Sequence, residues 1–166
     1  MNLQVSDVIG HVIALMQGIN ENVEGIETAP VIAPTQYSMS KMPMALVWEA
    51  DKGEASGKQG LSTIRQNFVV EVLYAPATTG LKASNFGATR VLHARFVDAY
   101  LARINGQQDE VLDYGQVSGI RVQIMKDRPI IFSAVESAMV AYMPEVPYYG
   151  FKLSVPIMAR WGSELL

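Results

Sequence analysis

One stretch of the sequence has the composition of a phosphate-binding loop. Residues 51–60 read DKGEASGKQG and contain Gly53, Gly57 and Lys58. A P-loop has four residues between its glycines and a hydroxyl residue after the lysine, because the backbone amides wrap a phosphate and the hydroxyl holds the magnesium ion. Here the gap between the glycines is one residue short, and Gln59 stands where the hydroxyl belongs.

The residues on either side of this stretch argue further against a nucleotide site. A P-loop leads into a helix, whose N-terminus binds the anion. Residues 61–75 read LSTIRQNFVVEVLYA and alternate along their length, with the β-branched and aromatic residues that favour strands. Residues 44–50, MALVWEA, also predict a strand. We therefore predict that residues 51–60 are the flexible, polar tip of a long β-hairpin that projects from the body.

The two imidazoles of the chain do not form a catalytic or metal-binding group. His11 and His93 fall on different predicted helices, with no H-E-x-x-H motif around either. A single helical histidine is most simply a polar residue at the boundary of the core. The sequence also has no G-x-S-x-G elbow for a nucleophilic serine and no G-x-G-x-x-G after a strand.

The carboxylates form two clusters, and neither has the spacing of a calcium loop. One cluster lies at the predicted hairpin tip, and the other follows the second predicted helix: Glu49, Asp51 and Glu54, then Asp109, Glu110 and Asp113. Both are interpreted as solvated loop charge. We therefore predict a protein that is not an enzyme, with no catalytic residue, no metal and no cofactor.

Two amphipathic helices are predicted to position the rest of the chain. Residues 6–19 have apolar side chains at helical spacing after Ser6 as N-cap. Residues 86–104 follow Ser84 or Asn85 as the cap and end before an Asn-Gly pair. The apolar stripe of this second helix is Leu92, Phe96, Val97, Tyr100, Leu101 and Ile104. Truncating Phe96 or Leu101 to alanine is expected to cost about 2–5 kcal/mol of stability.

The remaining apolar segments predict further strands. Residues 117–125 and 148–161 alternate, and Pro156 in the last of these indicates an edge position or a bulge, because proline cannot donate to a ladder. Periodicity leaves residues 130–143 open between a short strand with extra structure and a strand throughout. The order of elements predicts a single α+β domain over residues 1–166, with a mainly antiparallel sheet of about four strands and two helices packed on one face.

Composition points towards assembly with other proteins. Charged residues make up only 17% of the chain and the net charge is −3, which gives no basic footprint for sequence-specific DNA binding. No apolar run approaches the roughly 20 residues needed to span a membrane. Residues 20–43 include Tyr37, Met39 and Met42 without helical or strand periodicity. Methionine and tyrosine are enriched at interfaces, so these three are predicted partner contacts; the alternative is that the segment folds over its own core.

The element order and texture of nearly the whole chain resemble one protein family. An N-terminal amphipathic helix precedes the hairpin MALVWEA–DKGEASGKQG–LSTIRQNFVVEVLYA, the helix FGATRVLHARFVDAYLARI and a final strand of the YYGFKLSVPIMARW kind. This order is similar to that of the lambda-type tail terminator proteins, neck components of long-tailed bacteriophages. The chain departs from the pattern in its proline- and methionine-rich segment after the first helix and in residues 130–143.

The resemblance implies a structural virion protein made in the host cytoplasm. Such proteins form a hexameric ring that caps the tail tube, ends tail polymerisation and presents a surface to the head-side connector protein, with DNA only passing through the lumen. Alternatives are another neck or minor tail protein, or a small-molecule-binding or accessory α+β domain. At the hairpin tip, Asp51, Lys52, Glu54 and Lys58 are predicted partner contacts, in a loop that becomes ordered or shielded when the ring docks.

Overall fold

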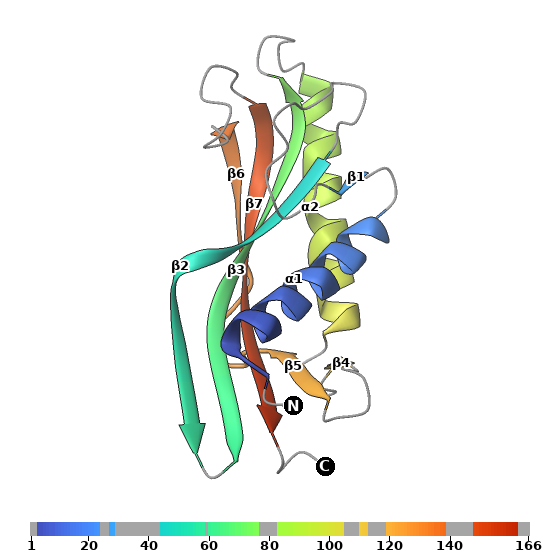
Figure 1. Cartoon of the computed structure of the whole chain (residues 1–166). Helices are drawn as coiled ribbons and strands as arrows, with labels where there is room; N and C mark the ends of the chain where they lie inside the picture. Colours follow the sequence, from blue (N-terminus) through green and yellow to red (C-terminus); the bar gives the residue numbers. More distant parts are fainter. Residues whose placement is uncertain are drawn as a thin grey trace.

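The computed structural model of this chain describes residues 3–23, 27–28, 44–58, 60–76, 83–104, 110–112, 119–138 and 148–162. It combines two helices with one mainly antiparallel sheet (Figure 1), which confirms the predicted α+β fold. In chain order the elements are α1 (Val5–Glu21), β1 (Glu27–Thr28), β2 (Met44–Lys58), β3 (Leu61–Pro76), α2 (Ala83–Arg103), β4 (Glu110–Leu112), β5 (Ile120–Ile124), β6 (Ile131–Ala138) and β7 (Tyr148–Gly162).

The sheet is larger than the sequence predicted. Its strand order is β1-β2-β3-β7-β5-β4, and β6 pairs with β7 beside this path. All the pairs are antiparallel except β1 with β2. Five strands of five or more residues form the sheet, and the short strands β1 and β4 extend it. Within the segment that periodicity left open, β6 is a strand.

Strand β7 lies in the middle of the sheet, so the prediction of an edge position for Pro156 is wrong. β3 pairs with β7 along the whole strand, while on the other side β6 pairs up to Ser154 and β5 pairs from Ile157 onwards. Pro156 lies between these two partners, and its carbonyl accepts a hydrogen bond from Met125 N at 2.8 Å. In a strand the N–H and C=O of one residue point to the same side. Pro156 therefore lacks its N–H on the side where the partner of β7 changes from β6 to β5.

Both helices begin earlier than their predicted caps. Gln4 is the N-cap of α1, and its backbone N donates to Asp7 Oδ2 at 2.9 Å, so that Ser6 lies within the first turn. Helix α2 begins at Ala83, which also places Ser84 and Asn85 within a first turn. The spacing of apolar residues located each helix, but it did not identify the residue at which each helix begins.

The core cluster combines buried residues of α1 and α2 with the odd-numbered residues of β7 and buried residues of the other strands. On α2, the rings of His93 and Phe96 pack against Phe151 with centroid distances of 3.9 and 5.7 Å. Near the other end of β7, Trp161 Nε1 donates to the backbone carbonyl of Leu3, just before α1, at 3.3 Å. Odd-numbered strand residues share one face, so α2 and Leu3 contact the same face of β7; the packing of both helices on one side of the sheet stays a prediction.

A buried hydrogen bond joins the two helices. Tyr100 on α2 is fully buried, and its hydroxyl donates to Asn20 Oδ1 of α1 at 2.7 Å, with the carbonyl of Met16 at 3.3 Å. Burial raises the pKa of Tyr100, so the hydroxyl stays protonated and remains a donor. This bond fixes the register of α1 against α2.

Two side chains of α2 lie differently from their predictions. His93 is buried instead of lying at the boundary of the core, and burial lowers the pKa of its imidazole below the ordinary value of 6.5. Leu101 was assigned to the core stripe but is 49% exposed. The buried face follows Phe96, Tyr100 and Ile104. Leu101 comes one residue after Tyr100, and one residue turns the helix by about 100°.

The contrast between Phe96 and Leu101 gives a paired stability test. Phe96→Ala leaves a cavity beside Phe151 and should lower the free energy of unfolding by about 3–5 kcal/mol. Leu101→Ala removes a half-exposed side chain and should cost less than about 1 kcal/mol. Denaturant unfolding measures both values. Equal losses for the two variants would contradict the observed orientation of α2.

Candidate functional site

Residues 51–58 are strand and not loop, which corrects the central sequence prediction. Strand β2 continues to Lys58, and its partners on β3 run from Gly53↔Gln66 to Lys58↔Leu61. Gly60 in the turn has φ 83°, a conformation that glycine adopts most readily. The prediction that a strand and not a helix follows Gly60 is confirmed. The hairpin is therefore paired up to its turn, and its backbone to Lys58 needs no partner protein to become ordered.

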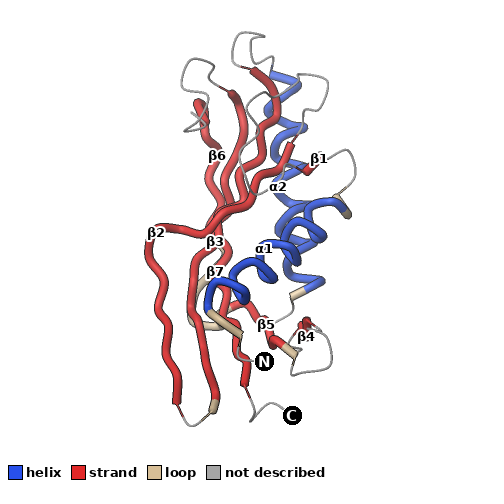
Figure 2. The backbone as a smooth tube through the Cα atoms, in the orientation of Figure 1, coloured by secondary structure: helices blue, strands red, loops and turns tan. Residues whose placement is uncertain are grey.

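A β-bulge divides β2 into two halves. The register with β3 shifts between Glu49 and Gly53, where Figure 2 shows β2 turning sharply. Across this bulge, Gln66 Nε2 donates to the carbonyl of Ala50 at 2.6 Å and lies 3.3 Å from the carbonyl of Lys52. Backbone carbonyls at a bulge lose ladder partners, so the amide of Gln66 replaces a missing strand contact.

Gly53 is needed for this arrangement because the Gln66 side chain occupies the space of a Cβ. A Cβ built on Gly53 would overlap Gln66 Oε1 and crowd its Cδ. Gln66 is itself buried, at 8% exposure, so its side chain has little room to move aside. The bulge, the glycine and the glutamine therefore act together to set the direction of the outer half of the hairpin.

The outer half of β2 is an open sheet edge. In Figure 1 the ends of β2 and β3 extend beyond both helices. β1 pairs with Met44 and Ala45 on the far side of β2, and among the described strands none pairs there with residues 46–58. Such an edge presents a row of backbone N–H and C=O groups that can accept another strand.

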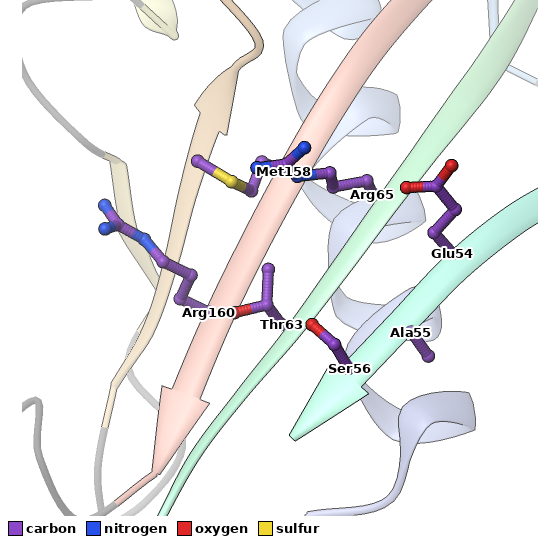
Figure 3. Close-up of a pocket in the computed structure, with 7 residues that line it drawn as sticks. All are labelled: Glu54, Ala55, Ser56, Thr63, Arg65, Met158 and Arg160. Atoms are coloured by element: carbon purple, nitrogen blue, oxygen red, sulfur yellow. The ribbon is translucent and has the colours of Figure 1, made fainter. Parts of the chain in front are cut away.

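The second exposed feature is the sheet face opposite the core, which we call the outer face. A hollow of about 550 Å³ lies on it over β2, β3 and β7 (Figure 3). Its lining residues are Glu54, Ala55, Ser56, Thr63, Arg65, Met158 and Arg160. Strand pairing aligns Ser56, Thr63 and Arg160 in one row, with Glu54, Arg65 and Met158 in the next. Charged and hydroxyl side chains thus converge from three strands.

Strand β5 adds a third arginine to this face. Arg121 is exposed and lies directly opposite Arg160 on β7. Arg160 Nη2 donates to Gln123 Oε1, also on β5, at 3.4 Å. With Arg65 in the neighbouring row, the guanidinium groups of Arg65, Arg121 and Arg160 form what we call the arginine cluster.

At the other end of the outer face lies a buried carboxylate. Glu71 is 2% exposed, and its Oε2 lies 3.6 Å from Lys152 Nζ. Burial raises the pKa of Glu71 above 4.5, although Lys152 acts in the opposite direction. The ammonium of Lys152 also lies 5.9 Å from the ring centroid of Trp48.

The predicted contact residues fall partly within this site. Lys52 and Glu54 are exposed on the outer half of β2. The backbones of Asp51 and Lys58 belong to the same strand, and their side chains lie outside the described part. Tyr37, Met39 and Met42 lie outside the described residues altogether. All of these remain predictions as partner contacts.

The arginine cluster was missed by sequence reasoning. Its three members come from three strands that are far apart in the chain, and only the register brings them together. The sequence does show that each arginine alternates with apolar residues along its strand, β3, β5 or β7. This alternation places each arginine on the solvent-facing side of its strand.

This arrangement can bind through backbone groups and through charge. Within the described residues, no group of three or more His, Cys, Asp or Glu side chains could hold a metal ion. No helix in the same residues is long and apolar enough to cross a membrane.

In the comparisons with known proteins, no family model matches the chain, and no curated protein matches it either.

Gly53 and Gly57 provide a matched test of the bulge. Gly53→Ala should displace the Gln66 amide from its two carbonyls and cost about 1–3 kcal/mol, the usual loss when a buried polar group is left unsatisfied. At Gly57 the nearest atom to an added Cβ is Ser62 Oγ at 3.7 Å, an ordinary contact, so Gly57→Ala should change stability little. Thermal or denaturant unfolding of both variants measures the difference, and a larger loss at Gly57 would contradict the role of Gln66.

The raised pKa of Glu71 predicts a pH dependence of definite sign. The folded state holds the proton of Glu71 more tightly than the unfolded state. Its stabilising contribution is therefore complete below pH 4.5, the ordinary pKa, and decreases as pH rises through the folded-state pKa. Glu71→Gln removes the titration. The stability of the variant relative to the wild type should therefore increase between pH 4 and pH 7. A relative decrease would show that Lys152 outweighs burial.

Proposed function

We propose that this chain is a structural subunit of a bacteriophage neck, a tail-terminator protein that forms a ring on the end of the tail tube. In this role it would end tail polymerisation and join the tail to the head-side connector. The observation that carries the proposal is the long β2–β3 hairpin, whose outer half extends beyond the helices and has an open edge.

An open edge of this length is a hazard for a protein that acts alone. Natural proteins cover such edges or interrupt them with proline and charge, because exposed strands pair with other chains. The unpaired edge of residues 46–58 contains no proline, and its charged residues are Glu49, Asp51, Lys52, Glu54 and Lys58. A closed ring removes the hazard by pairing or covering the edge in every subunit. This supports a function in ordered assembly.

The outer face supports the same function. Helix α2 and Leu3, just before α1, contact the core side of β7, whereas the outer face presents the hollow and the arginine cluster. A subunit inside a neck must contact a neighbouring subunit, a tube and a connector, and so needs several separate exposed surfaces. The edge and the outer face are two such surfaces.

The test is the length of tail tubes assembled in vitro. Tail-tube protein from the same phage is polymerised with and without this protein, and tube lengths are measured by electron microscopy. We expect shorter tubes that carry a ring at one end. Tubes of unchanged length and without rings would overturn the proposal.

A variant with a shortened hairpin tests whether β2–β3 makes the contact that caps the tail tube. Replacing residues 57–62 by Asn-Gly leaves the paired residues Ser56 and Thr63 beside a two-residue turn that suits hairpins. This variant should fold, as circular dichroism would verify, and should cap tubes less well. Normal capping by the folded variant would remove the hairpin tip from the proposed contact.

A second candidate function rests on the hollow of the outer face. Its size and its mixture of carboxylate, hydroxyl and guanidinium groups could suit a small polar molecule. The alternative is a small-molecule-binding or accessory domain, and it predicts a monomer that does not change tube length.

A further inference from the structure

The arginine cluster places like charges next to one another on exposed strands. Arg121 and Arg160 are directly opposite across the β5–β7 pair, and Arg65 lies in the neighbouring row on β3. Like charges opposite one another in a sheet destabilise it. A group of arginines held in this way is well suited to bind carboxylate or phosphate groups, because each guanidinium offers a planar fork of donors.

The rest of the hollow decides between these two kinds of anion. Glu54 lies directly opposite Arg65, at the open-edge side of the hollow. A polyphosphate chain laid across the hollow would meet this carboxylate and be repelled by it. A protein surface that carries charges of both signs can place a carboxylate on the arginines and a donor on Glu54. The pattern therefore favours a protein partner.

The charge of the chain itself identifies a suitable partner. The cluster and Glu54 hold three of the 13 basic residues and one of the 16 acidic residues. The remainder of the chain therefore has ten basic and 15 acidic residues. Among the described residues, Glu49, Asp98 and Asp127 are exposed, so a second copy of this chain offers carboxylates that complement the cluster. Contacts between unlike patches of identical subunits are heterologous, and they form a ring when the rotation from one subunit to the next closes.

We propose that the arginine cluster on the outer face of one subunit binds a carboxylate-bearing surface of the next subunit in the ring. This inference rests on the proposed ring, and it assigns one side of the subunit contact to Arg65, Arg121 and Arg160. The hollow beside the cluster receives side chains of the neighbour. The open edge of β2 borders the same hollow through Glu54 and Ser56, so the neighbour also covers part of that edge.

The test compares charge reversals in the full chain. Arg65→Glu and Arg121→Glu change exposed members of the cluster, and Arg90→Glu makes the same change on the exposed side of α2. Oligomer size is measured by sedimentation velocity over a range of protein concentrations. The two cluster variants should need a concentration roughly tenfold or more higher to assemble, since like charges across an interface oppose association. Arg90→Glu should assemble like the wild type.

Salt provides a second measurement on the unmodified protein. The screening length falls from about 10 Å at 0.1 M to about 3 Å at 1 M ionic strength. Wild-type rings should therefore dissociate more readily in high salt. A glutamate variant that melts at a lower temperature than the wild type is replaced in the test by Arg121→Gln. This substitution removes the positive charge without reversing it, so it should weaken assembly less strongly than Arg121→Glu.

The outcomes separate this inference from the proposed function. A wild-type chain that stays monomeric at every concentration would overturn both. Wild-type rings with unaffected cluster variants, or with an equal loss in Arg90→Glu, would overturn the inference alone. Cluster variants that form normal rings but no longer bind tube ends would place the tube protein on the cluster, and this too would overturn the inference.

Discussion

The whole sheet depends on the way β7 pairs its backbone on both sides. β3 follows it along one edge, whereas the other edge is shared by β6 and β5 in succession. A central strand must satisfy every buried N–H and C=O, and the change of partner would leave a donor unmatched at the junction. Pro156 has no N–H to leave unmatched there, and its carbonyl is taken by Met125. The proline thus allows one strand to join two smaller ones into a single sheet.

The same strand connects the core to the exposed surfaces. Its odd-numbered residues Phe151, Leu153, Val155, Ile157, Ala159 and Trp161 are buried. The alternate side chains, among them Met158 and Arg160, line the outer face. Because alternation along a strand is strict, the packing that fixes the core also fixes where the arginines lie. A shift of one residue in β7 would exchange the two sets and destroy both the core and the arginine cluster.

Sequence reasoning succeeded where a pattern was local and failed where pairing decided the structure. The ends of β3, β7 and α1 were placed within two residues, because each has a sustained apolar period. The outer half of β2 was missed because its glycine, lysine, glutamate and serine disfavour strands, and pairing with β3 overrides that preference. Leu101 was misplaced because a wide apolar stripe does not show which of two adjacent residues points inward. The arginine cluster required the register of three strands, which no local pattern contains.

The bulge in β2 separates the outer half of that strand from the half that packs in the core. The inner half of β2 contributes Ala45 and Val47 to the core cluster, whereas Lys52 to Gly57 are exposed. A continuous strand would transmit any strain at its tip directly to the buried half. The bulge interrupts the ladder, and the Gln66 amide holds the two halves at a fixed angle through the carbonyls of the bulge. Strain in the outer half of β2 would therefore reach the inner half of that strand through a joint of hydrogen bonds, whereas β3 runs from the turn into the core without a register shift.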